Sequence, residues 1–384
     1  MKVMNVVGAR PNFMKIAPLI RAMNQYNRAQ GTGCGIQQLL VHTGQHYDYA
    51  MSEIFFRELD LPAPSYSLGA GSASHAKQTA VIMTRFEDVC ISDPPGMVVV
   101  FGDVNSTLAC SLVSSKLGIP VAHVESGLRS YNRSMPEEIN RVVTDHLSSF
   151  LFCPTEKSVK NLEREGFESI VEGGRLLENL PDITVPSGLT DNRMVFNTGD
   201  IMYDMMLQAL EKSSSSSSVL SGLSVEPGSY NLLTIHRAEN TGDLRVLSER
   251  LKFARDNGSG CPVVFPVHPR TRKILENVPG NLLEKMILSE PVGYFDMVWL
   301  IKNANMVFTD SGGVQKEAYW AGTPCVTLRE ETEWPETVES GRNVLYKNYG
   351  GRHIFRQVNA LAYGDGRSAC RMAGIIERAL STNG

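Results

Sequence analysis

The stretch Asp310-Ser311-Gly312-Gly313-Val314-Gln315-Lys316-Glu317 joins a strand-like run to a helix-like run. The apolar run Asn305–Thr309 precedes it, and Glu317–Ala321, closed by Gly322, follows it. A strand, small residues and then a helix form an arrangement that directs unpaired backbone N–H groups toward an anion. The glycines permit close backbone approach, and Ser311 is suited to cap the helix. The pattern predicts either a diphosphate-sugar site or an ordinary capped helix of an α/β protein.

Short apolar runs alternate with helix-like stretches on both sides of this segment. Such alternation predicts parallel sheets that are covered on both faces. Two sets of runs predict the fold class, an α/β protein with two doubly wound, Rossmann-like domains. The first set is Val3–Val7, Gln37–His42, Met97–Phe101, Val121–Val124 and Phe150–Cys153. The second set is Met194–Asn197, Asn231–Ile235, Val263–Val267, Met286–Leu288, Met306–Thr309 and Cys325–Thr327.

The domain bounds follow from where this pattern weakens. We expect a first domain over 1–187, a second over 188–366, and a C-terminal helix over 367–384 that packs across the domain junction. The polar stretch 170–193 is interpreted as a loop insertion. The serine run Ser213–Ser218 is typical of a flexible surface loop.

Composition excludes several classes of protein. The 384 residues carry a formal net charge of −4 with scattered Lys and Arg, so we expect no nucleic-acid partner. No apolar run approaches the ~20 residues of a membrane span, and the N-terminal run is interpreted as a strand rather than a signal peptide. The seven cysteines include no C-x-x-C pair, which favours reduced thiols and a cytoplasmic location.

Charged residues follow two of the predicted strands of the first domain, Val3–Val7 and Met97–Phe101. Ligands of open α/β sheets bind beyond the carboxyl ends of the strands. Arg10 and Lys15 follow the first strand, where they either face an anion or are solvated charges at a helix start. Asp103 follows Met97–Phe101 and is either a helix N-cap or a site carboxylate.

Two further carboxylates follow in the same domain. Glu125 ends the strand Val121–Val124, and an unpaired carboxylate is costly to bury there. It is therefore expected either to form a salt bridge, with Arg129 as a candidate, or to act in catalysis. Glu137 follows Pro136 at a helix start, where acidic residues also favour the helix dipole without any further role.

Two histidines end strands of the second domain. His236 with Arg237 follows Asn231–Ile235, and His268 follows Val263–Val267. A lone histidine is usually explained by packing, but two at strand ends with adjacent arginines favour a polar site. The sequence contains no G-x-G-x-x-G loop after the first strand, so a dinucleotide cofactor is not expected.

A metal site is not expected either. His42 and His46 are the only close histidine pair, and Asp48 is the only nearby third ligand. The two histidines straddle a strand end and a turn instead of sharing one helix face.

The motifs, in their order along the chain, resemble the non-hydrolysing UDP-N-acetylglucosamine 2-epimerase family. The resemblance begins with Gly8–Pro11 and Lys15, and it covers nearly the whole chain except 170–193 and the serine run. Its other motifs are His42–Asp48, Gly102–Thr107, His123–Arg129, Met135–Arg141, Thr234–Asn240, Pro266–Pro269, Thr309–Glu317, Arg329–Glu336 and Tyr363–Gly366.

The resemblance implies a glycosyltransferase-B type fold with the active site between two Rossmann-like domains. It implies an enzyme without metal or nicotinamide, acting on a UDP-sugar, and we expect a homodimer. The implied acid/base carboxylates and catalytic-site histidine are Asp103, Glu125, Glu137 and His236. The implied UDP-binding positions are Arg10, Lys15, Ser311, Gly312, Gly313 and Glu317. We expect further substrate contacts at Arg141, Arg237 and His268.

The implied reaction is reversible inversion at C2 of UDP-N-acetylglucosamine through elimination and re-addition of UDP. Three alternatives stay open from the sequence. One is the same chemistry on UDP-2,3-diacetamido-glucuronate, since His42–Asp48 and Arg329–Trp334 also resemble that branch. The others are a hydrolysing epimerase and a non-catalytic protein that binds nucleotide sugars.

Overall fold

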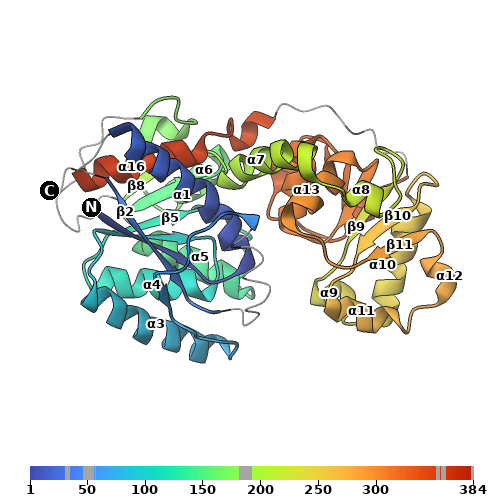
Figure 1. Ribbon diagram of the computed structural model, residues 1–384, viewed down its shortest axis with the longest axis horizontal. Coiled ribbons are helices and arrows are strands. Elements are labelled where there is room, and N and C mark those ends of the chain that lie inside the picture. The colour runs from blue at the N-terminus through green and yellow to red at the C-terminus, as the bar shows by residue number, and fades with distance from the viewer. Residues whose placement is uncertain are drawn as a thin grey trace. The chain divides into compact units, whose positions relative to one another are not determined.

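The computed structural model describes residues 1–30, 35–45, 56, 58–180, 193–351, 355 and 360–381, and it divides into two compact units (Figure 1). Unit 1 comprises Met1–Met205 together with Leu361–Gly384, and unit 2 comprises Met206–Ala360. Each unit is built on its own parallel sheet. The predicted α/β class with two Rossmann-like domains is therefore confirmed.

Unit 1 contains an eight-stranded sheet in the order β3-β2-β1-β4-β5-β6-β8-β7. The run from β3 to β6 has the 3-2-1-4-5-6 order of doubly wound folds, in which the direction of winding reverses between β1 and β4. Its strands are β1 (Lys2–Val7), β2 (Gln37–His42), β3 (Tyr66–Ser67), β4 (Met97–Phe101), β5 (Val121–Val124), β6 (Phe150–Cys153), β7 (Ser169–Ile170) and β8 (Met194–Asn197).

Helices cover the sheet of unit 1. Every residue of β4 is buried, as expected for a central parallel strand with both faces covered. The helices are α1 (Arg10–Gln30), α3 (His75–Ser92), α4 (Asn105–Lys116), α5 (Pro136–Leu147), α6 (Glu156–Arg164), the first turn of α7 (Ile201–Ser216) and α16 (Ser368–Ser381), with a 3₁₀ turn at Val171–Gly174.

The C-terminal helix α16 belongs to unit 1, where it packs beside α1 (α16 red and α1 blue in Figure 1). The carboxylate of Asp204 on α7 accepts N–H groups from Ser368 and Ala369, at 3.1 and 2.7 Å, in the first turn of α16. Arg371 in turn donates to Asp365 at 2.6 Å. These contacts explain why the chain returns to the first unit after completing the second.

Unit 2 contains a six-stranded sheet in the order β11-β10-β9-β12-β13-β14, which is again 3-2-1-4-5-6. Its strands are β9 (Asn231–Thr234), β10 (Val263–Pro266), β11 (Met286–Ser289), β12 (Met306–Thr309), β13 (Cys325–Thr327) and β14 (Asn343–Leu345). Its helices, after the end of α7, are α8 (Val219–Gly222), α9 (Ala238–Thr241), α10 (Leu244–Asp256), α11 (Pro269–Leu275), α12 (Gly280–Leu283), α13 (Tyr294–Asn303), α14 (Gly312–Ala321) and α15 (Pro335–Glu339), with a 3₁₀ turn at Tyr346–Asn348. A further 3₁₀ turn, Ala360–Tyr363, lies where the chain passes from unit 2 back to unit 1.

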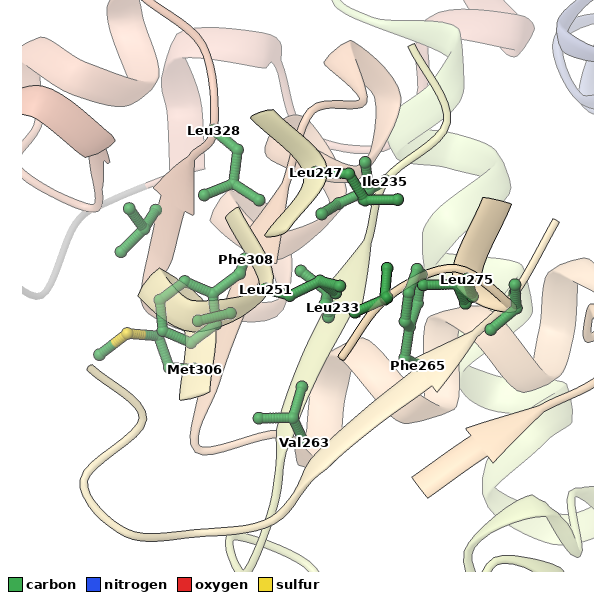
Figure 2. Close-up of a cluster of buried hydrophobic side chains, with 14 of the residues drawn as sticks. Leu233, Ile235, Leu247, Leu251, Val263, Phe265, Leu275, Met306, Phe308 and Leu328 are labelled. Atoms are coloured by element: carbon green, nitrogen blue, oxygen red, sulfur yellow. The ribbon is translucent and has the colours of Figure 1, made fainter. Parts of the chain in front are cut away.

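The core of unit 2 shows why β9, β12 and α10 hold together. Figure 2 shows Leu247 and Leu251 of α10 near Leu233 of β9 and Phe308 of β12, and all four side chains are fully buried. Leu247 and Leu251 are four residues apart, so one face of α10 meets the sheet. Burying each such side chain contributes about 1.5–3 kcal/mol, which fixes the strand ends from which the polar loops start.

Three sequence expectations need correction. Met194–Asn197 does not open the second sheet but pairs with β6 and β7 of the first. The observed units therefore differ from the predicted 1–187, 188–366 and 367–384, although the predicted boundary itself lies outside the described residues. Ser213–Ser216 of the serine run extend α7, and Ser213 donates a hydrogen bond to the carbonyl of Phe295 at 2.9 Å, so this part of the run is helical instead of a loop.

Part of the stretch 170–193 is also structured. It contributes the second residue of β7 and the 3₁₀ turn, and Leu180 lies against Gly374 of α16. Among the helices that the structure describes, none is long and apolar enough to cross a bilayer.

Candidate functional site

The winding reversal of unit 1 is held together by Asn12. Its Oδ1 accepts the N–H groups of Gly8 and Ala9, at 3.2 and 3.0 Å, and its Nδ2 donates to the carbonyl of Phe101 at 3.0 Å. One buried side chain thus ties the loop after β1 to the end of β4. Ligands of doubly wound sheets bind at such a reversal, so this is where a site is expected.

Lys15 of α1 and Glu125, which follows β5, form an ion pair at this place. Each side chain is only 10% exposed. Gly102, at the end of β4, makes room for them, because a Cβ there would lie 2.9 Å from the Lys15 Nζ and 3.5 Å from the Glu125 Oε2. The basic residue after β1 and the carboxylate after β5 are therefore brought together.

Asp103 and Arg141 form a second ion pair beside the first. The Asp103 side chain is 31% exposed, whereas Arg141, on α5, is buried. Arg141 also approaches Glu138 at 3.2 Å, and Asn140 donates to the Asp103 carbonyl at 2.9 Å. The helix α5 therefore positions the loop after β4 through Asn140 and Arg141, and it leaves the Asp103 carboxylate partly exposed to solvent.

Glu125 has a left-handed backbone conformation, with a φ of 75°. Such a conformation costs a non-glycine residue roughly 1–3 kcal/mol, and it persists where the surroundings impose it. Glu137 lies in the first turn of α5 and is exposed, whereas its neighbour Glu138 is buried and accepts the N–H groups of Ser130 and Tyr131 at 2.9 Å each. The loop at Ser130 and Tyr131 is therefore held by Glu138 and not by Glu137.

In unit 2, Asp310 organises the ends of β9 and β12. It is fully buried, and it accepts the N–H groups of His236 and Arg237 at 3.1 and 3.0 Å and the Nδ2 of Asn240 at 3.1 Å. The His236 Nδ1 lies 3.1 Å from its other oxygen. Burial alone would raise the pKa of Asp310, but the hydrogen bond and charge of His236 and the donors around it hold that pKa below its ordinary value.

His236 is thereby oriented with one ring nitrogen on Asp310. Its side chain is 49% exposed. A carboxylate on Nδ1 selects the tautomer and fixes the ring, which is the arrangement of a histidine that acts on a ligand. His268 lies at the corresponding end of β10 and is half-buried.

The helix α14 begins as the sequence predicts. Ser311 is its N-cap and accepts the N–H of Val314 at 3.5 Å, while Gly322 ends the helix in a left-handed conformation. Gly312 is in close contact with a carboxylate, since a Cβ there would lie 2.2 Å from the Glu333 Oε1. A Cβ at Gly313 would meet its nearest atom, the Ser311 Oγ, only at 3.9 Å. Of the two glycines, Gly312 is the one that the packing requires.

Cations surround Glu333 at the start of this helix. Arg329 donates to Glu333 at 2.7 Å and Arg237 lies 3.7 Å away. Burial alone would raise the pKa of Glu333, but the charge of Arg329 and the neighbouring donors hold it below the ordinary value. Lys316, on α14, lies 3.8 Å from the ring centre of Trp334. Basic groups therefore converge on the helix N-terminus, where an anion is favoured.

The alternatives for the carboxylates are partly decided by these contacts. Asp103 does not cap α4, because the N-cap residue is Val104. Glu125 does not pair with Arg129, which instead binds Asp145 and Glu165 at 2.7 and 2.6 Å.

Some predicted residues lie outside the described part of the chain. These are the side chain of Arg10, at the start of α1, and residues His46 and Asp48 of the weighed metal site. Within the described residues, no three His, Cys, Asp or Glu side chains are grouped closely enough to hold a metal ion. Glu317 is described and is buried on α14.

Sequence reasoning did not single out several residues that shape the two sites. Asn12, Glu138, Asp310, Asn240 and Glu333 are all buried or nearly so. Of these residues, Asp310 could have been found from the sequence, because it comes directly after the apolar strand Met306–Thr309, much as Asp103 comes soon after β4. Glu333 lies in a loop without periodicity, and only the fold brings it to Gly312.

Comparisons with known proteins agree with this geometry. A relative from Methanococcus maripaludis, named a UDP-N-acetylglucosamine 2-epimerase homolog, is 44% identical over 90% of this chain and 88% of its own. The UDP-2,3-diacetamido-2,3-dideoxy-D-glucuronate 2-epimerase of Pseudomonas aeruginosa is 42% identical over the same shares of the two chains.

A solved structure is similar over almost the whole length. It is the UDP-GlcNAc 2-epimerase of Methanocaldococcus jannaschii in complex with UDP-GlcNAc and UDP, with 38% identity, a TM-score of 0.77, and 98% and 99% of the two chains covered. The fold is thus of the expected glycosyltransferase-B type. The family model described as UDP-N-acetylglucosamine 2-epimerase matches residues 31–377, and this chain is a member of that family.

Proposed function

We propose that this protein catalyses reversible C2 epimerisation of UDP-N-acetylglucosamine to UDP-N-acetylmannosamine by elimination and re-addition of UDP. The observation that carries the proposal is the pair of carboxylates, Asp103 and Glu125, on the ends of neighbouring strands at a winding reversal. Each is held by its own cation, Arg141 or Lys15. Membership of the epimerase family supports the same reaction.

The proposed reaction needs groups that move protons at C2 and groups that stabilise the departing diphosphate. A base takes the C2 proton while the C1–O bond to UDP breaks, which leaves a C1=C2 double bond in a 2-acetamidoglucal. UDP then adds back to C1, and a proton is delivered to the opposite face of C2. We assign proton transfer to Asp103, Glu125 and Glu137, and assistance at the site to His236.

UDP is assigned to the loop and helix start of unit 2, with help from the loop after β1. The N–H groups at the start of α14 and the nearby cations favour the negative charge that grows on the leaving diphosphate. The proposed UDP-binding residues are Arg10, Lys15, Ser311, Gly312, Gly313 and Glu317, with Arg141, Arg237 and His268 as further substrate contacts.

The direct test is incubation with UDP-N-acetylglucosamine in deuterium oxide, followed by product NMR. The elimination mechanism predicts deuterium at C2 of both epimers, because the proton removed exchanges with solvent before a proton returns. Retention of the original C2 hydrogen through turnover would rule the mechanism out. Free N-acetylmannosamine would identify a hydrolysing enzyme, and UDP binding without turnover would identify a non-catalytic protein.

A second substrate is favoured by one observation, the 42% identity to the diacetamido-glucuronate epimerase. The same incubation with UDP-2,3-diacetamido-glucuronate decides between the two sugars. Faster turnover of this compound, measured as kcat/KM, would place the chain in that branch. The assignment of the carboxylates would be unchanged, because C2 inversion is the same step on both sugars.

Ser311→Ala and Glu317→Gln are expected to weaken UDP and UDP-sugar binding by equal factors. The two changes remove a hydroxyl and a carboxylate from the proposed UDP site, and each loss is expected to be about 1–3 kcal/mol. Isothermal titration calorimetry with UDP measures the effect. Asp243→Ala is the control, since it removes the N-cap of α10 in the same unit and should change stability but not UDP affinity. Unchanged UDP binding with impaired use of the UDP-sugar would move this loop to the sugar.

The remaining proposals concern location and assembly. The six cysteines that the structure describes in the free state support a cytoplasmic location, and a homodimer stays a prediction.

A further inference from the structure

His123 lies in the middle of unit 1, between the two strand ends that carry Asp103 and Glu125. It belongs to β5 and is completely buried. Its Nε2 lies 2.8 Å from the carbonyl oxygen of Gly102, the residue before Asp103. Its Nδ1 lies 2.7 Å from the Oδ1 of Asp145, on α5. A fully buried histidine whose two ring nitrogens both have hydrogen-bond partners belongs to a specific polar network and is not explained by apolar packing.

Besides His123, Asp145 contacts two groups that can only donate hydrogen bonds, Gly127 N–H and Arg129. Its Oδ2 accepts the N–H of Gly127 at 3.1 Å and the Nη1 of Arg129 at 2.7 Å. Burial alone would raise the pKa of Asp145, but the hydrogen bond and charge of His123, with those of Arg129, hold that pKa below its ordinary value. Gly127 and Arg129 donate to it whatever the state of His123, so Asp145 is treated as a carboxylate. Arg129 is itself balanced by Glu165, which it contacts through two nitrogens at 2.6 Å.

The donor count then fixes the state of the His123 ring. A carbonyl oxygen and a carboxylate both accept hydrogen bonds, so each ring nitrogen must carry a proton. The other titratable group beside Asp145 is Cys153 of β6, and burial raises the pKa of its thiol, so it stays neutral and does not compete. We propose that His123 is a buried imidazolium that acts as the positioning residue of the acid/base site, holding the ends of β4 and β5 in register beneath Asp103 and Glu125.

The backbone near His123 contains two left-handed residues that need to be held in place. Gly102 and Glu125 are both left-handed, with φ values of 65° and 75°. The hydrogen bond to the Gly102 carbonyl fixes the first of these turns. The second is fixed because Ser126 donates to the His123 carbonyl at 2.7 Å and Gly127 donates to Asp145. One side chain and its partner thus hold the backbone from which both carboxylates extend, and proton transfer requires such groups to be precisely placed. The catalytic part of this inference rests on the proposed function.

The first test reads the protons of the ring directly. Protein labelled with ¹⁵N-histidine is examined by two-bond ¹H–¹⁵N correlation across neutral pH, with the His123 signals assigned from their loss in His123→Asn and their shift in Asp145→Asn. The expected pattern is an imidazolium, with protons on both ring nitrogens, because both nitrogens face acceptors. A neutral tautomer with one protonated nitrogen would overturn the proposal. This test uses no substrate, so it is independent of the proposed function.

The second test separates positioning from folding. His123→Asn is expected to lower kcat on the order of 10-fold or more, with KM and UDP affinity changed less than about twofold, because the reacting groups and not the UDP site are displaced. His146→Asn, on the partly exposed side of α5, is the matched control and should retain the wild-type kcat. A folded His123→Asn protein with wild-type kcat would refute the positioning role.

A third test, hydrogen exchange at Gly102, requires no enzymatic turnover. The Gly102 N–H donates to the carbonyl of Val124 at 3.0 Å, so its hydrogen exchange reports the register of β4 and β5. Exchange at Gly102 is expected to accelerate in His123→Asn and in Asp145→Asn, and not in His146→Asn. If the wild type epimerises neither UDP-sugar, the proposed function fails, while the ring spectrum and this exchange still decide the state and role of His123. Unchanged exchange in both variants would show that His123 holds nothing in place.

Discussion

Asp103→Asn is expected to lower kcat for C2 epimerisation by about 100-fold or more while the protein stays folded. The change removes a proton acceptor but keeps the size of the side chain, and general acid–base catalysis contributes about 10²–10⁴-fold to rate. Folding should survive because the Asp103 side chain is 31% exposed and does not cap α4. Initial rates and the Tm of the variant measure the two effects separately.

The control for this variant is Asp93→Asn. Asp93 also pairs with a cation, Lys2, and its carboxylate accepts in addition from the Tyr66 hydroxyl at 2.8 Å. It lies at the C-terminal end of α3, away from the carboxyl ends of β4 and β5, so its loss should leave kcat unchanged. A near-normal rate for Asp103→Asn, or the same small loss in both variants, would show that Asp103 is a structural ion-pair partner only.

Glu125→Gln and Glu137→Gln extend the same comparison to the other two proposed carboxylates. Glu137 is the more discriminating position, because it is exposed and its replacement cannot disturb packing. A large fall in kcat there would have to come from chemistry or substrate binding. Glu125→Gln leaves Lys15 without its carboxylate in a nearly buried place, so part of its effect is expected as lost stability.

Much of the fold was readable from the sequence because the strands are short, apolar and bounded by polar residues. The predicted runs Met97–Phe101, Val121–Val124 and Met306–Thr309 are the observed strands β4, β5 and β12. The residue pattern of a strand does not predict, however, which strand it pairs with in a sheet. Met194–Asn197 was assigned to the wrong sheet because only β6, beside which it lies in space, decides its place.

The prediction of a loop over the serine run was wrong for a related reason. Serine is a modest helix former, and a run of it predicts a loop when local preference alone is considered. The structure overrides that preference through tertiary contacts, since Ser213 is buried against the Phe295 carbonyl and Ser217 donates to Asp296 at 2.7 Å. Local composition cannot report contacts made with α13, about 80 residues further along the chain.

The polar residues at the strand ends are predictable from the sequence, but the pairs that they form are not. Polar residues after apolar strands identified Asp103, Glu125 and His236, because all parallel strands of a sheet end on one edge. The pairing of Glu125 with Lys15 instead of Arg129 depends on β1 lying beside β4, and β4 beside β5. Arg129 is near in sequence, yet Asp145 and Glu165 already satisfy it.

Asp204 makes the stability of unit 1 depend on pH in a direction opposite to that of most carboxylates. It lies in α7, is only 4% exposed, and accepts the first N–H groups of α16. Burial raises its pKa from 3.8 to about 7, and the charge of Asp200 adds to the effect, while the N–H groups of Ser368 and Ala369 and the charge of Arg371 oppose it.

The sign follows from proton binding. Because the folded state holds the proton more tightly than the unfolded state, the stabilisation is complete below pH 3.8 and is lost as the pH rises through about 7. The full difference corresponds to about 4 kcal/mol, of which about 3 kcal/mol is lost between about pH 5 and about pH 8. The contact between α7 and α16 is therefore expected to weaken toward alkaline pH.

Asp204→Asn is expected to remove this dependence, because the amide does not titrate while its oxygen still accepts one of the two N–H groups of α16. The measurement is native-state hydrogen exchange of α16 amides at about pH 5 and about pH 8, corrected for the intrinsic pH dependence of exchange. The wild type should lose about 3 kcal/mol of protection across this interval relative to the variant. Asp88→Asn, on the exposed face of α3, carries the same charge change and should follow the wild type. Parallel curves for wild type and Asp204→Asn would mean that Asp204 is ionised across the whole interval, with the N–H groups of α16 and the charge of Arg371 outweighing its burial.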